Sequence, residues 1–446
     1  MRVFSVLIIL SLALPLEAAK KPKWTKINKA ALGHLVSLIK INTENTAANE
    51  AEAAVYIEKV FKANGIEAEI FTSTKGRSGV IARLKAKADP DAQEAAGKPL
   101  LLMSHLDTAS PKSKNWKIDP WGAEQKKGFI YGLGAMDSKA LLAANMAVFL
   151  AIKSIDPDLS RDVVFLALPD GMGGGNFGIK WLIANRKDAL DAEFALLPGG
   201  FSAVDNGEVS EVVVQCAEKL TFVTRIKAIG KSVFTHPPHP ENPIVILAKA
   251  ISRLNAHVYS TSLNSITSKY FSLLGKNYPG YQFGTLEYSM VRNIVVPTQI
   301  NGGARDAADS AWVLLNINAL PQTNENDLLE ELKRVISDPR VSFDESMFAL
   351  TPKTGMSSVK SVFYKAIEAS AQDVYPEAKT APFMSPWTTN AAHLRKVGVR
   401  AYGIGMPRER SEPYVADGNR AEKVSKAMFE KTIRFVYGVI KNSAIK

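Results

Sequence analysis

The chain has 446 residues, of which 46% are hydrophobic, so it can bury a large core, and we expect two domains rather than a disordered or fibrous structure. The formal net charge of +11 is spread along the whole sequence without an aromatic-interleaved basic motif or a zinc finger, which argues against a nucleic-acid site. Cys216 is the only cysteine and excludes an internal disulfide.

The first segment, residues 1–19, has the pattern of a signal peptide. A basic Arg2 precedes an apolar run of about 14 residues, which is too short for a comfortable membrane span, and small residues follow at Ala18 and Ala19. The alternative is a buried N-terminal helix. The signal-peptide interpretation predicts a periplasmic or secreted protein that is not an integral membrane protein.

Residues 20–218 show helical and strand patterns in alternation, which is typical of an α/β domain with a mostly parallel sheet flanked by helices. The predicted helices are Lys29–Ile39, Glu50–Asn64 and Ser138–Ile155, and the predicted strands are Glu67–Phe71, Gly79–Leu84, Leu100–Ser104 and Val163–Ala167.

Residues 219–350 have a different pattern. Strands are predicted at Thr221–Ala228, Asn293–Ile300 and Trp312–Ile317, with a helix at Pro243–Leu254, which is the order of a small β-α-β-β unit of the α+β class. The earlier pattern returns after Met356, so we expect this unit to be inserted into the α/β domain, which resumes over residues 351–446.

Two short motifs carry residues suited to metal chemistry. His105 and Asp107 follow a buried strand, where an imidazole can bind a metal while the carboxylate fixes its orientation. Asp137 follows a glycine turn at the start of a predicted helix, and it is either a helix N-cap or a carboxylate that bridges two metal ions. The His-x-Asp pair taken alone is more often structural.

Together these motifs resemble a known enzyme family. SHLDTA at 104–109, WKIDPW at 116–121 and GFIYGLGAMDSKA at 128–140 are similar to the zinc-dependent family of aminoacylases, carboxypeptidase S, glutamate carboxypeptidase and succinyl-diaminopimelate desuccinylase. The resemblance runs from about Ala30 to the C-terminus. It implies a catalytic α/β domain interrupted by a lid that often forms a homodimer, and two zinc ions that share an aspartate, here Asp137, with His105 as a further ligand and Asp107 in support.

The chain departs from the family at the other metal positions. Gly171 stands where the resemblance expects the glutamate that acts as general base, and Met172 and Pro198 stand where it expects carboxylate ligands. Asp417 replaces the C-terminal histidine ligand. Because zinc in proteins normally takes at least three protein ligands, these replacements predict at most one partially liganded ion.

The lid motifs depart as well. The oxyanion-stabilising histidine of the family falls on Phe234, although His236 and His239 lie nearby and would compensate if the loop shifts. The arginine that clamps a substrate carboxylate falls on Asn318, which has no cationic fork.

Three hypotheses follow. The leading one is an exported, catalytically inactive homologue that binds a peptide or an N-acyl-amino-acid-like ligand. The second is an active carboxypeptidase- or aminoacylase-type hydrolase with one metal held by His105, Asp137 and Asp417, and with Asp170 recruited as base. The third is a structural partner that assembles through the lid.

Overall fold

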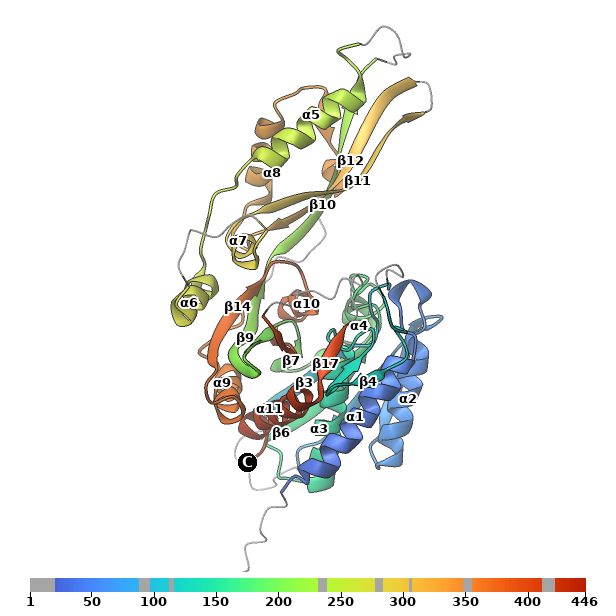
Figure 1. The fold of residues 1–446 in the computed structure, drawn as a ribbon, viewed down its shortest axis with the longest axis vertical. Coiled ribbons are helices and arrows are strands. Elements are labelled where there is room, and N and C mark those ends of the chain that lie inside the picture. Colours follow the sequence, from blue (N-terminus) through green and yellow to red (C-terminus); the bar gives the residue numbers. More distant parts are fainter. Residues whose placement is uncertain are drawn as a thin grey trace, which may run out of the picture.

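The computed structural model describes residues 21–87, 97–111, 116–231, 239–276, 284–304, 307–347, 355–410 and 422–446. These residues form two lobes joined by a narrow waist (Figure 1). The α/β part, near both ends of the chain, is the lower lobe. The inserted part forms the upper lobe, except that residues 265–274 pack beside residues 379–385 of the lower lobe. The predicted signal segment lies outside the described residues. Within them, no helix combines the length and apolar character needed to cross a bilayer.

The helices of the α/β part are α1 (Trp24–Lys40), α2 (Glu50–Ala63), α3 (Lys139–Ile155), α4 (Ile179–Asn185), α9 (Val362–Val374), α10 (Asn390–Lys396) and α11 (Lys426–Ala444). Its large sheet has the order β1 (Ala68–Thr74), β2 (Arg77–Leu84), β6 (Arg161–Leu168), β3 (Gly97–His105), β7 (Phe194–Pro198), β15 (Arg400–Ile404), β9 (Glu208–Glu218), β8 (Phe201–Asp205) and β16 (Pro407–Glu409), and β14 (Lys379–Ser385) also pairs with β9. A small sheet contains β17 (Lys423–Ser425), β5 (Phe129–Tyr131) and β4 (Glu124–Lys126).

The central strands β6, β3, β7 and β15 pair in parallel, which confirms the predicted fold class, whereas β1, β2 and β8 add antiparallel pairs toward the edges. Side chains of β3 alternate between two cores. Leu100 and Leu102 face a core with α1, α2, α3, α9 and α11, while Leu101 and Met103 face another with α4 and α10. Burial on both faces explains why the strand reads as an uninterrupted apolar run.

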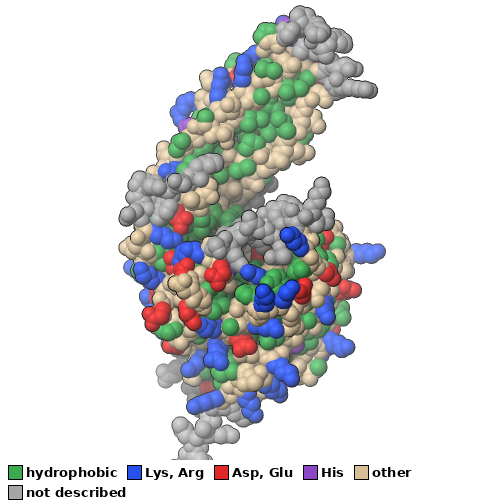
Figure 2. Space-filling model, viewed as in Figure 1, with side chains coloured by type: hydrophobic (Ala, Val, Ile, Leu, Met, Phe, Trp, Pro, Cys, Tyr) green, Lys and Arg blue, Asp and Glu red, His purple; other side chains and the backbone are tan. Residues whose placement is uncertain are grey.

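The inserted part is larger than the predicted β-α-β-β unit. Its sheet has the order β11 (Ile294–Ala304), β12 (Ala307–Ala319), β10 (Leu220–Ile229) and β13 (Val341–Phe343), and its helices are α5 (Pro243–Ala256), α6 (Ser265–Leu274), α7 (Leu286–Met290) and α8 (Glu325–Ile336). Helices α5 and α8 cover one face, and Figure 2 shows hydrophobic side chains gathered over this sheet. The five-residue helix α7 and the three-residue strand β13 are too short to show periodicity, whereas the amphipathic pattern of α8 was present in the sequence and was overlooked.

A single residue, Lys219, links β9 of the α/β part to β10 of the inserted part. Its N–H donates to the Ser385 carbonyl at 3.0 Å, and its own carbonyl accepts from the Thr388 hydroxyl at 3.1 Å. The ammonium group donates to the carbonyl of Arg292, just before β11. Lys219 therefore ties together the chain segments that pass through the waist.

The burial of Lys219 gives a pH-dependent stability. Burial lowers the pKa of its ammonium to about 7. Between that value and the ordinary lysine value the unfolded chain binds one more proton than the folded chain, so stability rises with pH. From pH 7 to about pH 8.5 we expect the free energy of unfolding of the parent protein to rise by about 1.5 kcal/mol. The variant Lys219→Met should not show this rise. Urea titrations at both pH values measure it, and the same pH dependence of the unfolding free energy in both proteins would contradict the prediction.

Cys216 lies on β9 and is fully buried. Burial raises the pKa of its thiol to about 12, so almost no thiolate forms near neutral pH. We expect the folded chain to resist a thiol-specific disulfide reagent, and one equivalent to react once urea unfolds it. Fast labelling in the absence of denaturant would show that β9 opens locally.

Candidate functional site

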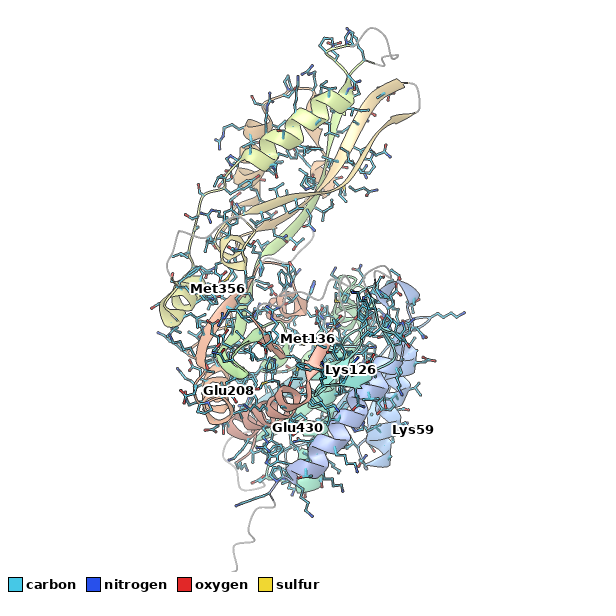
Figure 3. All side chains as sticks on the ribbon, viewed as in Figure 1. Lys59, Lys126, Met136, Glu208, Met356 and Glu430 are labelled. Carbon is cyan, nitrogen blue, oxygen red and sulfur yellow. The ribbon has the colours of Figure 1, made fainter. Side chains whose placement is uncertain are left out.

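The candidate site lies where neighbouring strands of the large sheet end. β3 ends at His105, β6 at Leu168 and β7 at Pro198, and because these strands are parallel their carboxyl ends share one edge. Open α/β sheets place their sites at such an edge. Figure 3 labels Met136, which precedes Asp137 in the sequence, on the side of the α/β part that faces the inserted part.

Asp107 anchors the glycine-rich turn that follows β6. Its buried carboxylate accepts from the backbone N–H of Gly171 at 2.7 Å, from that of Met172 at 2.8 Å and from the Asn45 side-chain amide at 2.7 Å. Burial alone would raise its pKa, but the hydrogen bond to His105 and these donors hold the pKa below its usual value. Asp107 is thus an ionised structural acceptor.

His105 connects Asp107 to Asp137. Its Nδ1 donates to the backbone carbonyl of Asp107 at 2.9 Å, and the Asp107 carboxylate is 3.3 Å away. Its Nε2 lies 3.1 Å from Oδ1 of Asp137. Burial alone would lower the pKa of His105, but the two carboxylates raise it well above its usual value. The protonated ring then donates to Asp137 as well.

The interpretation of Asp137 as a helix N-cap is wrong. Ser138 holds the N-cap position of α3, and Asp137 lies before it, with a side chain that is 38% exposed and directed to His105. The buried carboxylate of Glu422 fixes the preceding turn by accepting from the N–H groups of Gly134 at 3.1 Å and Met136 at 3.0 Å.

Asp170 helps to hold the glycine turn. Its backbone has φ of 61°, and its side chain is buried. One carboxylate oxygen accepts from Asn45 at 3.1 Å and the other from the N–H of Phe177 at 3.0 Å. Its own N–H donates to Glu50, which pairs with Arg77 in a buried ion pair. Each oxygen of Asp170 accepts a hydrogen bond that shapes the turn.

The base position, Gly171, has no room for a side chain. A Cβ atom there would lie 2.5 Å from Cβ and 2.6 Å from Cγ of His105, closer than side chains pack. Met172, at the neighbouring ligand position, is 37% exposed. What both residues supply to the described site is a backbone N–H directed at Asp107.

Of the remaining predicted positions, the structure describes Pro198 and Asn318. Pro198 ends β7 and pairs with Ile404 of β15, and its ring offers no metal ligand. Asn318 lies on β12 in the inserted part and lines a pocket beside Trp387. His236 and Asp417 lie outside the described residues.

Sequence reasoning missed two side chains that shape the site. Asn45 donates to both Asp107 and Asp170, although it lies in a short 3-10 helix, Asn45–Ala47, 62 residues before Asp107. Lys139 is buried, donates to the carbonyl of Ile41 at 2.8 Å and lies 5.1 Å above the ring of Trp121. Lys139 belongs to the motif GFIYGLGAMDSKA at 128–140, but nothing in that motif predicts that its ammonium group is buried.

The residues at the motif positions do not supply the ligands of a two-zinc centre, because Met172 and Pro198 carry no carboxylate. Nε2 of His105 lies 3.1 Å from Asp137, and the carboxylate of Asp107, 3.3 Å from Nδ1 of His105, already accepts three hydrogen bonds. The turn of Gly171 and Met172 directs amide donors, not acceptors, toward the site. We derive no catalytic step through zinc.

Comparisons with known proteins place the chain in a family. The model of peptidase family M20/M25/M40 matches residues 101–442. The chain belongs to this family. The resemblance drawn from the motifs is therefore confirmed, and the chain is a member of a family of metallohydrolases.

Individual members of the M20/M25/M40 family show the same relationship. The human N-fatty-acyl-amino acid synthase/hydrolase PM20D1 is 24% identical over 388 residues, which cover 80% of this chain and 75% of that protein. The M20 family metallo-carboxypeptidase Sso-CP2 from Sulfolobus solfataricus superposes with a TM-score of 0.69 at 20% identity, covering 92% of this chain and 98% of that one.

A third relative bears on the metal. The Bacillus subtilis YXEP protein, described as a dinuclear metal binding peptidase of the M20 family, superposes with a TM-score of 0.62 at 13% identity, covering 93% of this chain and 98% of that one. At these identities the solved structures show a common fold. The comparisons do not support the expectation that the present chain is inactive, which rests on its own residues alone.

Proposed function

We propose that this M20-family chain binds a peptide or an N-acyl-amino-acid-like ligand and does not hydrolyse it by the two-zinc mechanism. One observation carries the proposal: the position of the general base, Gly171, packs directly against His105. Glycine has no side chain that could accept a proton. Because His105 occupies the adjacent space, a longer side chain would not fit at position 171.

The chemical consequence is large. General-base assistance typically contributes a factor of about 100 to 10,000 to the rate. The neighbouring acids do not replace it, because Asp107 and Asp170 are buried acceptors of structural hydrogen bonds.

The ligand class follows from the relatives. The human relative is named for N-fatty-acyl-amino acids and the Sulfolobus one for carboxypeptidase activity, so the substrates of both contain an amide bond next to an amino acid. A retained cleft would bind the same kind of molecule. We further propose a periplasmic or secreted location, from the signal-like segment 1–19, and self-association through the inserted part.

The test combines metal analysis with a substrate panel. We expect the purified chain to hold fewer than two equivalents of zinc and to release no amino acid from peptides or N-acyl-amino acids with zinc added. The human relative serves as the positive control. Two tightly bound zinc ions with turnover similar to that control would overturn the proposal.

The contact between His105 and Asp137 favours a second candidate, an active hydrolase with one metal held by these residues and Asp417. His105→Ala and Asp137→Ala separate the two candidates. Loss of bound metal together with loss of turnover in both variants supports the hydrolase, whereas unchanged metal content and turnover reject it.

A further inference from the structure

A pocket of about 300 Å³ lies where the inserted part meets the α/β part. Leu286 of α7 and Ile294 of β11 line it from the inserted part, and Pro386 and Trp387, which follow β14, line it from the other side. Its volume is at the lower end of the range of small-molecule sites, about 300 to 1,000 Å³. A ligand here would contact both lobes.

The pocket wall is uncharged. None of the described residues that line it is ionisable, and its polar groups are the side chains of Asn318, Ser289 and Thr285 and the indole N–H of Trp387, together with the backbone. A carboxylate placed against such a wall would lose water without gaining a cation, which is costly. A neutral carbonyl needs only one good hydrogen-bond donor.

Asn318 supplies that donor. The Thr221 hydroxyl donates to Oδ1 of Asn318 at 3.0 Å. With Oδ1 occupied by Thr221, the Nδ2 amide remains for the pocket, and it has no hydrogen-bond partner among the described residues.

We propose that this pocket selects an uncharged amide: Nδ2 of Asn318 donates to a neutral carbonyl oxygen while an apolar side chain lies against Trp387. The inference rests on the proposed binding function and narrows its ligand class. The preferred ligands are N-acylated amino-acid amides and internal peptide segments, not molecules with a free carboxylate.

Calorimetry with two nearly isosteric probes tests the selectivity. N-acetyl-phenylalanine amide and N-acetyl-phenylalanine differ in one group, CONH₂ against COO⁻. Salt of about 0.3 M screens the attraction between the acid and the positive net charge of the protein. We expect the amide to bind about tenfold tighter or more. Equal or tighter binding of the acid, or no binding of either probe, overturns the proposal.

Variants assign the selectivity to Asn318. Asn318→Ala should weaken amide binding about tenfold, and Asn318→Arg should reverse the preference toward the acid. Asn316→Ala, two residues away on β12 and outside the pocket, is the matched control and should bind like the parent. Identical affinities for Asn318→Ala and Asn316→Ala would refute the role of Asn318.

The result for the pocket can be distinguished from the result for the proposed function. Zinc content and hydrolysis are measured on the same preparations as the calorimetry. Turnover with two zinc ions would overturn the binding-protein proposal while leaving an amide preference intact, whereas preference for the acid would overturn the pocket assignment in a chain that is still inactive.

Discussion

Replacing Gly171 with glutamate will destabilise the fold by about 3 kcal/mol or more and will not restore hydrolysis. The new Cβ would meet His105 at 2.5 Å, and the new carboxylate would approach Asp107, whose Oδ1 lies 3.2 Å from the same Cβ position. Moving His105 away would disturb the hydrogen bonds at both of its ring nitrogens.

Met172→Glu is the matched control, because the side chain at position 172 is 37% exposed and its contact with Asp107 uses only the backbone. We expect a change within about 0.5 kcal/mol. Urea titration measures the free energy of unfolding of both single variants. A double variant that combines Gly171→Glu with Met172→Glu is assayed for hydrolysis of N-acyl-amino acids with added zinc. A stable double variant with clear zinc-dependent turnover would show that the glycine turn tolerates the family's catalytic residues.

Replacing Asp107 with asparagine will lower the free energy of unfolding by about 3 to 5 kcal/mol at neutral pH. Three donors, the N–H groups of Gly171 and Met172 and the amide of Asn45, converge on this carboxylate. An asparagine amide would direct its own N–H groups at one or more of these donors and leave buried groups unpaired.

Asp137→Asn is the control, since that carboxylate is 38% exposed and contacts His105 alone among the described side chains. We expect a loss of about 1 kcal/mol or less. The pKa of Asp107 is lowered in the folded chain, so its stabilisation is complete above the ordinary carboxyl pKa of about 4 and is lost as pH falls below it. The difference between the parent and Asp107→Asn should therefore shrink in acid. A constant difference down to low pH would show that the charge of Asp107 is not what stabilises the turn.

The central strands could be predicted from the sequence because a strand that is buried on both faces consists of an uninterrupted run of apolar residues. The apolar runs Leu100–Ser104 and Val163–Ala167 fall inside β3 and β6, and they place His105 and Asp170 at one sheet edge. The direction of a strand cannot be predicted in this way, because the apolar run is the same in parallel and antiparallel pairs. The antiparallel pairing of β2 with β6 was therefore not foreseen.

Within the site, residue types were predictable and contacts were not. The motif position of Gly171 predicted the loss of the base, but only the structure shows that His105 fills the space beside it. Asn45 lies in a short 3-10 helix with no motif, and the left-handed backbone of Asp170 is set by contacts distant in sequence, notably those with Asn45 and Glu50.

The inserted part is attached to the α/β part at two kinds of contact. One is the single-residue link at Lys219, which leaves no slack between β9 and β10. The other is a hydrophobic core in which α6 and the end of α7 pack against β8, β9 and β14. The β11–β12 hairpin, by contrast, reaches to the far end of the upper lobe (Figure 1). A ligand beside Trp387 contacts residues of both parts, so its affinity would report directly on how the two parts are held together.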